Sequence, residues 1–309
     1  MAPGNGSFMT QFILVGLTDQ PDLQLPLFFL FLIMYIITMM GNLGMITLIG
    51  LNSHLHTPMY FFLFNLSFID LCYSSVFTPK MLINIISKKN IISYMGCMTQ
   101  LYFLSFFGIS ECYVLTSMAY DRYVAICNPL LYNNAVSSKV CSSLVLGSYL
   151  MAFFDATTLI GCMLRLIFCD ANTINHYLCD IHPLLQLSCT STYLIEMEVF
   201  IVGGLNIIIP SLTIFISYGL ILTTILHINS KEGRSKAFST CSSHVIAVSL
   251  FFGSSAFMYL RPSSVSMDEG KISSVFYTNV VPMMNPLIYS LRNKDVRLAL
   301  RKTLRRGEF

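Results

Sequence analysis

Long apolar runs alternate with short polar segments along the whole chain. Seven runs stand out, at residues 25–49, 59–86, 97–127, 141–162, 197–226, 237–260 and 272–291. Each is close to or longer than the roughly 20 residues that a helix needs to cross the hydrocarbon of a bilayer. The seventh run contains several serine, threonine and asparagine side chains, which should face the bundle interior. The pattern predicts an all-α membrane protein with a seven-transmembrane helix bundle.

The amino-acid composition also indicates a protein that is embedded in a lipid bilayer. Hydrophobic residues make up 55% of the chain and charged residues 11%, whereas ordinary globular proteins carry roughly 25% charged residues. The first run follows a polar leader and is longer than the apolar core of a signal peptide, so we expect an uncleaved first span. Three regions result: an extracellular leader at 1–24, the bundle at 25–291 and a basic tail at 292–309.

The distribution of lysine and arginine predicts the orientation. If the leader is extracellular, the inner loops contain Arg122, Lys139, Lys231, Arg234 and Lys236, and the tail adds seven more cations. The outer loops carry fewer cations, and these are diluted by acidic residues. Cytoplasmic loops are normally the cation-rich ones, and an odd number of spans also puts the tail inside. We expect a short amphipathic helix after the last span, facing anionic lipid.

The longest loop, between the fourth and fifth runs, is rich in cysteine. Together with one cysteine at the outer start of the third run, it gives a set of four: Cys97, Cys169, Cys179 and Cys189. On an oxidising surface these would form two disulfides, which the sequence alone can pair in three ways. The alternative is a metal site built from side chains of the same loop: His176, Cys179, Asp180 and His182. The leader adds a glycosylation sequon at Asn5.

Two carboxylates fall in the middle of predicted spans, Asp70 and Glu111. A charge at that depth costs at least about 2.5–3.5 kcal/mol on insertion scales, so both side chains should face inward. We expect them near Asn42 and Asn285, where they would share a proton or bind a cation such as sodium. The alternative is a hydrogen-bonded structural cluster. A third acid, Asp155, has no partner that the sequence identifies.

The third run ends in a charged step, Asp121-Arg122-Tyr123. Glu111 and Arg122 are eleven residues apart, so on an ideal helix they share one face about three turns from each other. Arg122 is either an interfacial anchor or one half of a latch with Asp121. Lys236 and the deeper His244 would then shape a docking cleft, or lie on a solvated basic face.

Five motifs occur in order along the chain. They are LHTPMY at 55–60, MAYDRYVAIC at 118–127, SY at 217–218, KAFSTCSSH at 236–244 and PMMNPLIY at 282–289. With these motifs the chain resembles the odorant (olfactory) receptors, a branch of the rhodopsin-like G-protein-coupled receptors. The resemblance covers essentially the whole sequence.

The resemblance implies a multi-pass protein of the plasma membrane that serves the sense of smell. It implies disulfides between Cys97 and Cys179 and between Cys169 and Cys189. It also implies coupling to a stimulatory olfactory G protein, which raises cyclic AMP. The switch residues it implies are Asp121, Arg122, Tyr123, Tyr218, Lys236, His244, Asn285, Pro286 and Tyr289.

The ligand site should lie in the outer half of the bundle, between spans three, five, six and seven. The residues expected there are Leu104, Ser105, Gly108, Ile109, Ile181, Val202, Asn206, Phe252, Ser255, Ala256, Tyr259 and Thr278. They are mostly apolar and carry no charge, which favours a small neutral volatile ligand over an amine or a peptide. Each could instead be ordinary bundle packing. Where relatives often have tyrosine, this chain has Phe252, so a pocket hydroxyl is missing.

Other functional classes find little support in the sequence. Intramembrane acids also mark ion paths, so a transporter or channel is the first alternative. The sequence contains neither paired broken helices nor a repeat between its halves to favour it. Phosphate-binding loops, HExxH and nucleophile-elbow motifs are missing, which argues against an enzyme. We expect neither a resident metal cofactor nor a nucleic-acid partner.

Overall fold

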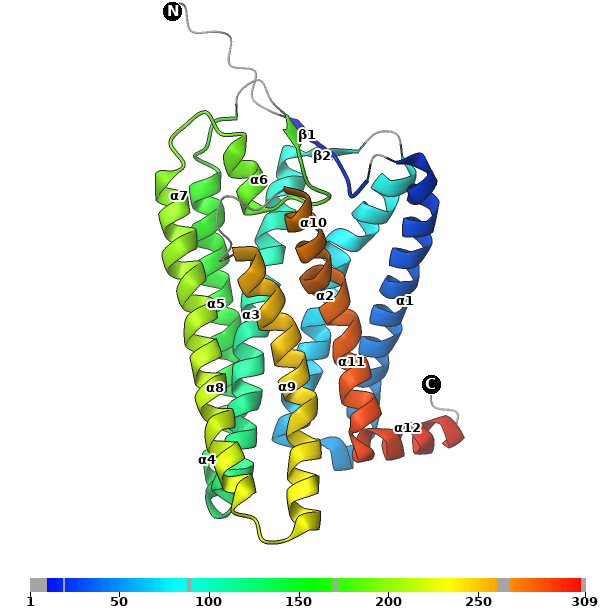
Figure 1. Cartoon of the computed structure of the whole chain (residues 1–309), viewed down its shortest axis with the longest axis vertical. Coiled ribbons are helices and arrows are strands. Elements are labelled where there is room, and N and C mark those ends of the chain that lie inside the picture. Colours follow the sequence, from blue (N-terminus) through cyan, green and yellow to red (C-terminus); the bar gives the residue numbers. More distant parts are fainter. Residues whose placement is uncertain (1–9, 19, 88–89, 169–171, 260–266, 307–309) are drawn as a thin grey trace, which may run out of the picture.

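The computed structural model describes residues 10–18, 20–87, 90–168, 172–259 and 267–306, and within these ranges it does not describe the side chains of 236, 240, 258–259, 267–269, 291–292 and 304–306. A bundle of long helices spans the molecule (Figure 1). The first four spans are α1 (Pro21–Leu51), α2 (Pro58–Ile86), α3 (Tyr94–Cys127) and α5 (Ser138–Met163). The fifth combines α7 (Tyr193–Glu198), the π-helical turn η3 (Val199–Gly203) and α8 (Gly204–Leu226). The sixth is α9 (Lys231–Tyr259).

The seventh span is built differently from the other six. It consists of α10 (Met267–Val275), the π-helical turn η4 (Phe276–Val280) and α11 (Val281–Arg292). Six helices of the described chain are long and apolar enough to cross a membrane, and this segmented span is not among them. Its polar side chains Ser274, Thr278, Asn279 and Asn285 are buried in the bundle, as the sequence predicted. Interior burial lets a polar helix lie at membrane depth.

Helix α3 lies at the centre of the bundle, packed against α2, α5, α8 and α9. Leu101 and Leu115 on this helix are fully buried. By contrast, most residues of α1 and α8 are not buried in the isolated chain, and their exposed side chains include large apolar ones such as Phe29 and Phe215. These surfaces belong against lipid, because a bilayer solvates apolar side chains as well as a protein core does.

A small sheet covers the outer end of the bundle. Its strand order is β2 (Ile91–Ser93), β1 (Gln11–Leu14) and β3 (Thr173–Ile174), with β1 antiparallel to β2 and parallel to β3. Burial alternates along β1, so Phe12 and Leu14 point into the core. We predicted only a polar extracellular leader for this part of the chain, and in the structure it contains the central strand of the sheet.

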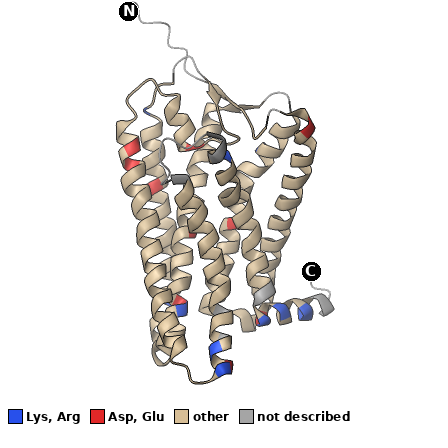
Figure 2. Ribbon diagram, in the orientation of Figure 1, with Lys and Arg blue, Asp and Glu red and all other residues tan. Residues whose placement is uncertain are grey.

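The two ends of the bundle differ in charge. Lys and Arg gather at the end where α9 begins and where α12 (Lys294–Arg306) lies across the bundle (Figure 2). In α12 the side chains of Val296, Ala299 and Thr303 are buried, while its described cations are exposed. The predicted amphipathic helix is therefore present. The cation-rich end is cytoplasmic, and β1 lies at the opposite, extracellular end (Figure 1).

Candidate functional site

A cavity of about 120 Å³ lies in the outer half of the bundle. Its walls come from α2, α3, α5, the fifth span, α9, η4 and the short helix α6 (Ile181–Gln186) of the second outer loop. Eight of the twelve residues expected at the ligand site line it: Leu104, Ser105, Gly108, Ile109, Ile181, Val202, Asn206 and Ser255.

Three of the other four expected residues are not part of this lining, and the side chain of the fourth is not described. Phe252 is buried beside the cavity, and its neighbour Phe251 forms the wall in its place. The missing hydroxyl at Phe252 therefore does not concern the cavity lining. Ala256 is also outside the lining, and Thr278 is buried with its hydroxyl 2.9 Å from the Tyr177 hydroxyl. Tyr259 ends α9, but its side chain lies outside the described residues.

The prediction that the lining carries no charge is wrong, because Asp155 and Glu198 both line the cavity. Asp155 also has a partner: Asn206 Nδ2 donates to its Oδ2 at 2.7 Å. The Tyr113 hydroxyl in turn donates to Asn206 Oδ1 at 2.7 Å, so this chain of hydrogen bonds joins α3, α8 and α5. Glu198 could have been found from the sequence, since it lies one helical turn before Val202 and two before Asn206. Asp155 could not, because it is 51 residues away from Asn206.

The second outer loop is tied down over the cavity. A disulfide joins Cys97, at the start of α3, to Cys179, which confirms the pairing that the resemblance implied. Gln100 Oε1 accepts the Cys179 backbone N–H at 2.8 Å, and the Asp180 carboxylate caps the N–H of Ile181. These contacts place Ile181 against the cavity.

The disulfide also bears on the metal alternative in this loop. Cys179 sulfur is bonded to sulfur, so it is not a metal ligand, and among the described residues no group of three His, Cys, Asp or Glu side chains could hold a metal ion. Cys189 is disulfide-bonded as well. Its expected partner Cys169 lies outside the described residues, and so does the sequon residue Asn5.

A second polar cluster lies at the middle of the bundle. Asn285 Nδ2 donates to Asp70 Oδ2 at 3.0 Å and to Glu111 Oε1 at 3.2 Å. Both acids are fully buried, and their other oxygens have no hydrogen-bond partner among the described residues. Asn42 was expected beside them, but it donates instead to the carbonyl of Pro282 at 3.1 Å.

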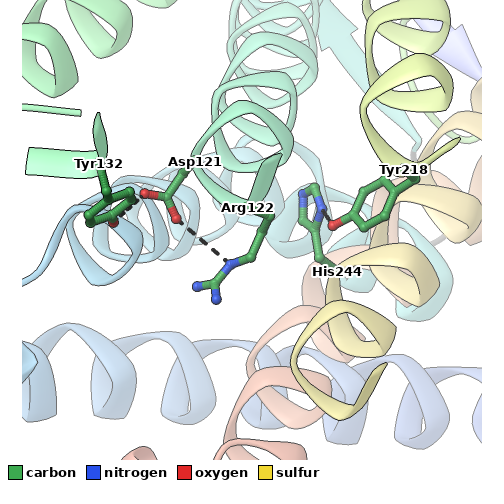
Figure 3. Close-up of polar contacts among 5 residues, drawn as sticks. All are labelled: Asp121, Arg122, Tyr132, Tyr218 and His244. Carbon is green, nitrogen blue, oxygen red and sulfur yellow. Dashed lines mark hydrogen bonds and ion pairs between the residues drawn. The ribbon is translucent and has the colours of Figure 1, made fainter. Parts of the chain in front are cut away.

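The inner end of α3 carries the expected ion pair, with Arg122 Nε 3.7 Å from Asp121 Oδ2 (Figure 3). The sequence missed a third member of this group, Tyr132 in the short helix α4 (Tyr132–Ala135), whose hydroxyl donates to Asp121 Oδ1 at 2.7 Å. Burial and the neighbouring carboxylate raise the pKa of Tyr132, so its hydroxyl remains a donor at neutral pH. Asp121 is thus held from two sides.

A large cavity of about 930 Å³ opens beside this group at the cytoplasmic end. Asp121, Arg122 and Tyr289 line it. The Tyr289 hydroxyl is buried and has no hydrogen-bond partner among the described residues. The arrangement combines a weakly held guanidinium with an unpaired hydroxyl, and both are able to form new hydrogen bonds if the helices move.

Tyr123, Tyr218, His244 and Pro286 are not among the residues that line this cavity. Tyr218 and His244 are hydrogen-bonded to each other across α8 and α9 (Figure 3). Tyr123 packs against a small buried cluster at the inner ends of the same two helices, and Pro286 on α11 faces α1. The Lys236 side chain lies outside the described residues.

The fold is a membrane helix bundle of the rhodopsin type. The structure superposes on squid rhodopsin with a TM-score of 0.72 over 93% of this chain and 87% of that one, at 20% sequence identity. A family profile described as "Olfactory receptor" matches residues 31–306.

Individual relatives agree with the profile. Olfactory receptor 8B3 of Homo sapiens is 73% identical and olfactory receptor 8B3 of Mus musculus is 70% identical, each over 98% of this chain and at least 96% of the relative. Olfactory receptor 8B8 of Homo sapiens is 66% identical over the full length of both chains. The chain therefore belongs to the olfactory receptor family, a family of multi-pass G-protein-coupled receptors of the plasma membrane and not of enzymes.

Proposed function

We propose that this receptor binds small volatile molecules in the outer cavity and activates a stimulatory olfactory G protein, which raises cyclic AMP. The main support is the course of α3. Gly108 lines the outer cavity and Arg122 lines the inner one. Fourteen residues separate them, a rise of roughly 21 Å along one continuous helix. A small movement of α3 at the ligand would therefore also displace its cytoplasmic end.

The inner cavity supplies the output in this proposal. Arg122 is held by one ion pair of 3.7 Å, which is longer than a normal charge-assisted hydrogen bond. Opening the bundle would free its guanidinium for a carbonyl or carboxylate of the G protein, and Tyr289 would gain a partner at the same time. A weak contact that is easily exchanged supports the proposed latch role of Asp121 and Arg122.

The ligand has to bias this switch with a small number of contacts. A molecule of about ten heavy atoms gains at most about 1.5 kcal/mol per atom and usually much less. It shifts the equilibrium only by its difference in affinity for the closed and open states. We therefore expect micromolar responses. The expectation of a neutral ligand rested on an uncharged lining, and with Asp155 and Glu198 in the wall it loses that basis.

The buried acids form a third part of the proposal. Asp70 and Glu111 share the single amide of Asn285, which leaves one oxygen of each unpaired. Two buried carboxylates in that position require a positive charge or a proton between them. We propose that they hold a sodium ion or a shared proton. If agonist dose–response curves coincide at all sodium concentrations and pH values, the proposed ion or proton at Asp70 and Glu111 is refuted.

The proposal is tested with a panel of volatile molecules and a cyclic AMP reporter in cells. Arg122→Ala should abolish the agonist response while the receptor remains detectable at the surface. Lys139→Ala is the matched control, because Lys139 is an exposed cytoplasmic-side cation outside the inner cavity. A full response from Arg122→Ala would refute the latch. Silence of the wild-type receptor to every volatile, at normal surface levels, would refute the proposed function.

A further inference from the structure

We propose that the outer cavity selects small amines, whose ammonium group pairs with the carboxylate of Glu198 beside that of Asp155. This inference rests on the proposed function, since it names the ligand class of the same cavity. Its starting point is the charge of the wall: both carboxylates line the cavity, and none of the described lining residues is a lysine, arginine or histidine.

Glu198 has an unsatisfied atom. Its Oε2 is out of reach of solvent and accepts no hydrogen bond from any described residue. Leaving a carboxylate oxygen in that state is unfavourable. A positively charged ligand that pairs with this carboxylate from the cavity lowers the penalty through its charge, whereas a ligand with only acceptor atoms adds to it.

Asp155 adds negative charge beside Glu198 and so strengthens the preference of the cavity for a cation. Its Oδ2 is occupied by the amide of Asn206 at 2.7 Å, so this contact fixes the carboxylate toward the fifth span. Asp155 and Glu198 lie close enough to act on each other electrostatically. Two neighbouring carboxylates with no cation between them create a negative potential that attracts a cation.

The rest of the wall fits an organic cation better than a metal ion. Leu104, Ile109, Leu159 and Ile207 give the cavity an apolar surface that suits a hydrocarbon body. No described set of three His, Cys, Asp or Glu side chains could coordinate a metal here. The volume of about 120 Å³ is close to the roughly 150 Å³ apolar cavity that accommodates benzene in another protein. A six-membered ring with one amino group matches that size.

The protons balance for either form of the ligand. An ammonium ion pairs directly with the carboxylate. A free amine that reaches a protonated carboxyl takes its proton, because an alkyl amine is far more basic than a carboxylate. Both routes end in the same ammonium–carboxylate pair, held by charge-assisted hydrogen bonds.

The test compares matched probes on the intact receptor in the cyclic AMP assay. Cyclohexylamine and cyclohexanol have the same ring and differ in the polar group, and benzylamine and benzyl alcohol form a second pair. We expect each amine to be at least about tenfold more potent than its alcohol, because both donate a hydrogen bond to the carboxylate but only the ammonium adds a charge–charge attraction. Equal potency within both pairs, or more potent alcohols, would overturn the inference without any mutant.

The variant Glu198→Gln keeps the shape and removes the charge. It should lower amine potency about tenfold or more and shift the alcohols much less. Glu196→Gln is the matched control, because Glu196 lies on the same helix, is paired with Thr192 and is not part of the cavity wall. If Glu198→Gln fails to reach the surface, Asp155→Asn serves as the second variant with the same expectation. Unchanged amine potency in a variant that reaches the surface would overturn the inference.

The two proposals fail in different ways. If neutral volatiles raise cyclic AMP and amines do not, the amine inference is refuted and the receptor function stands. If neither class acts on receptor that is present at the surface, both are refuted.

Discussion

The contact between α1 and α11 gives the sharpest stability prediction. A Cβ atom built on Gly41 would lie 2.9 Å from Cγ and 3.2 Å from Cβ of Pro286. Carbon atoms normally meet at about 3.5–4.0 Å, so Gly41→Ala forces the two helices apart by roughly 0.6 Å. The proline ring cannot rotate away as a flexible side chain could. Overpacking of this kind costs about 1–3 kcal/mol.

Function should suffer together with stability, because the residue next to Pro286 is Asn285, which bridges Asp70 and Glu111. We expect purified Gly41→Ala receptor in detergent to melt at least about 2 °C below the Gly44→Ala receptor, because both variants gain the same helix propensity and only Gly41→Ala is overpacked. Less of the variant should also reach the cell surface. A thermal-shift assay and surface immunostaining measure the two effects.

Gly44→Ala is the control for this prediction. It lies one turn away on the same helix, and a Cβ there would meet nothing within 4 Å. Alanine is the better helix former by about 1 kcal/mol, so this variant should melt at or above the wild-type temperature. If the two variants have the same melting temperature, the close approach of α1 and α11 does not limit stability, and the reasoning is refuted.

Two further predictions concern the outer half of the bundle. Cys97→Ser should block delivery to the cell surface, because it releases the second outer loop from α3. Cys162→Ser changes a free cysteine and should leave delivery intact, so equal surface staining of the two variants would contradict the prediction. Asn206→Leu should lower the melting temperature by leaving Asp155 and Tyr113 without their partner, at about 1–3 kcal/mol for each unsatisfied group. Melting at the wild-type temperature would show that this chain of hydrogen bonds does not stabilise the bundle.

The cavity shows where sequence reasoning reached its limit. The four residues predicted on α3, Leu104, Ser105, Gly108 and Ile109, all line the cavity. They could be predicted because an ideal helix puts them on neighbouring parts of one face. On α9 the prediction chose Phe252 where Phe251 forms the wall, a rotation of about 100° about the helix axis. Span four was left out, and so Asp155 was missed.

The inner switch was found in part for a similar reason. Asp121 and Arg122 are adjacent in the chain, so their pairing could be expected from the sequence. Tyr132 is eleven residues further on, beyond the break after α3, and its approach to Asp121 depends on how α4 folds back. A tyrosine in a loop carries no signal of its own that points to a particular carboxylate.

The sequence by itself determined the spans, their orientation, the amphipathic tail helix and the family. These features can be read directly along the chain. They depend on the number of apolar residues in each run, on which loops carry the cations and on motifs of contiguous residues. Only the tertiary structure decided the rotation of each helix, the close approach of Gly41 to Pro286 and the meeting of Asp155 with Glu198. The physical reason is that lipid and bundle interior are both apolar, so the hydrophobic pattern fixes how long a membrane helix is but not which of its faces turns inward.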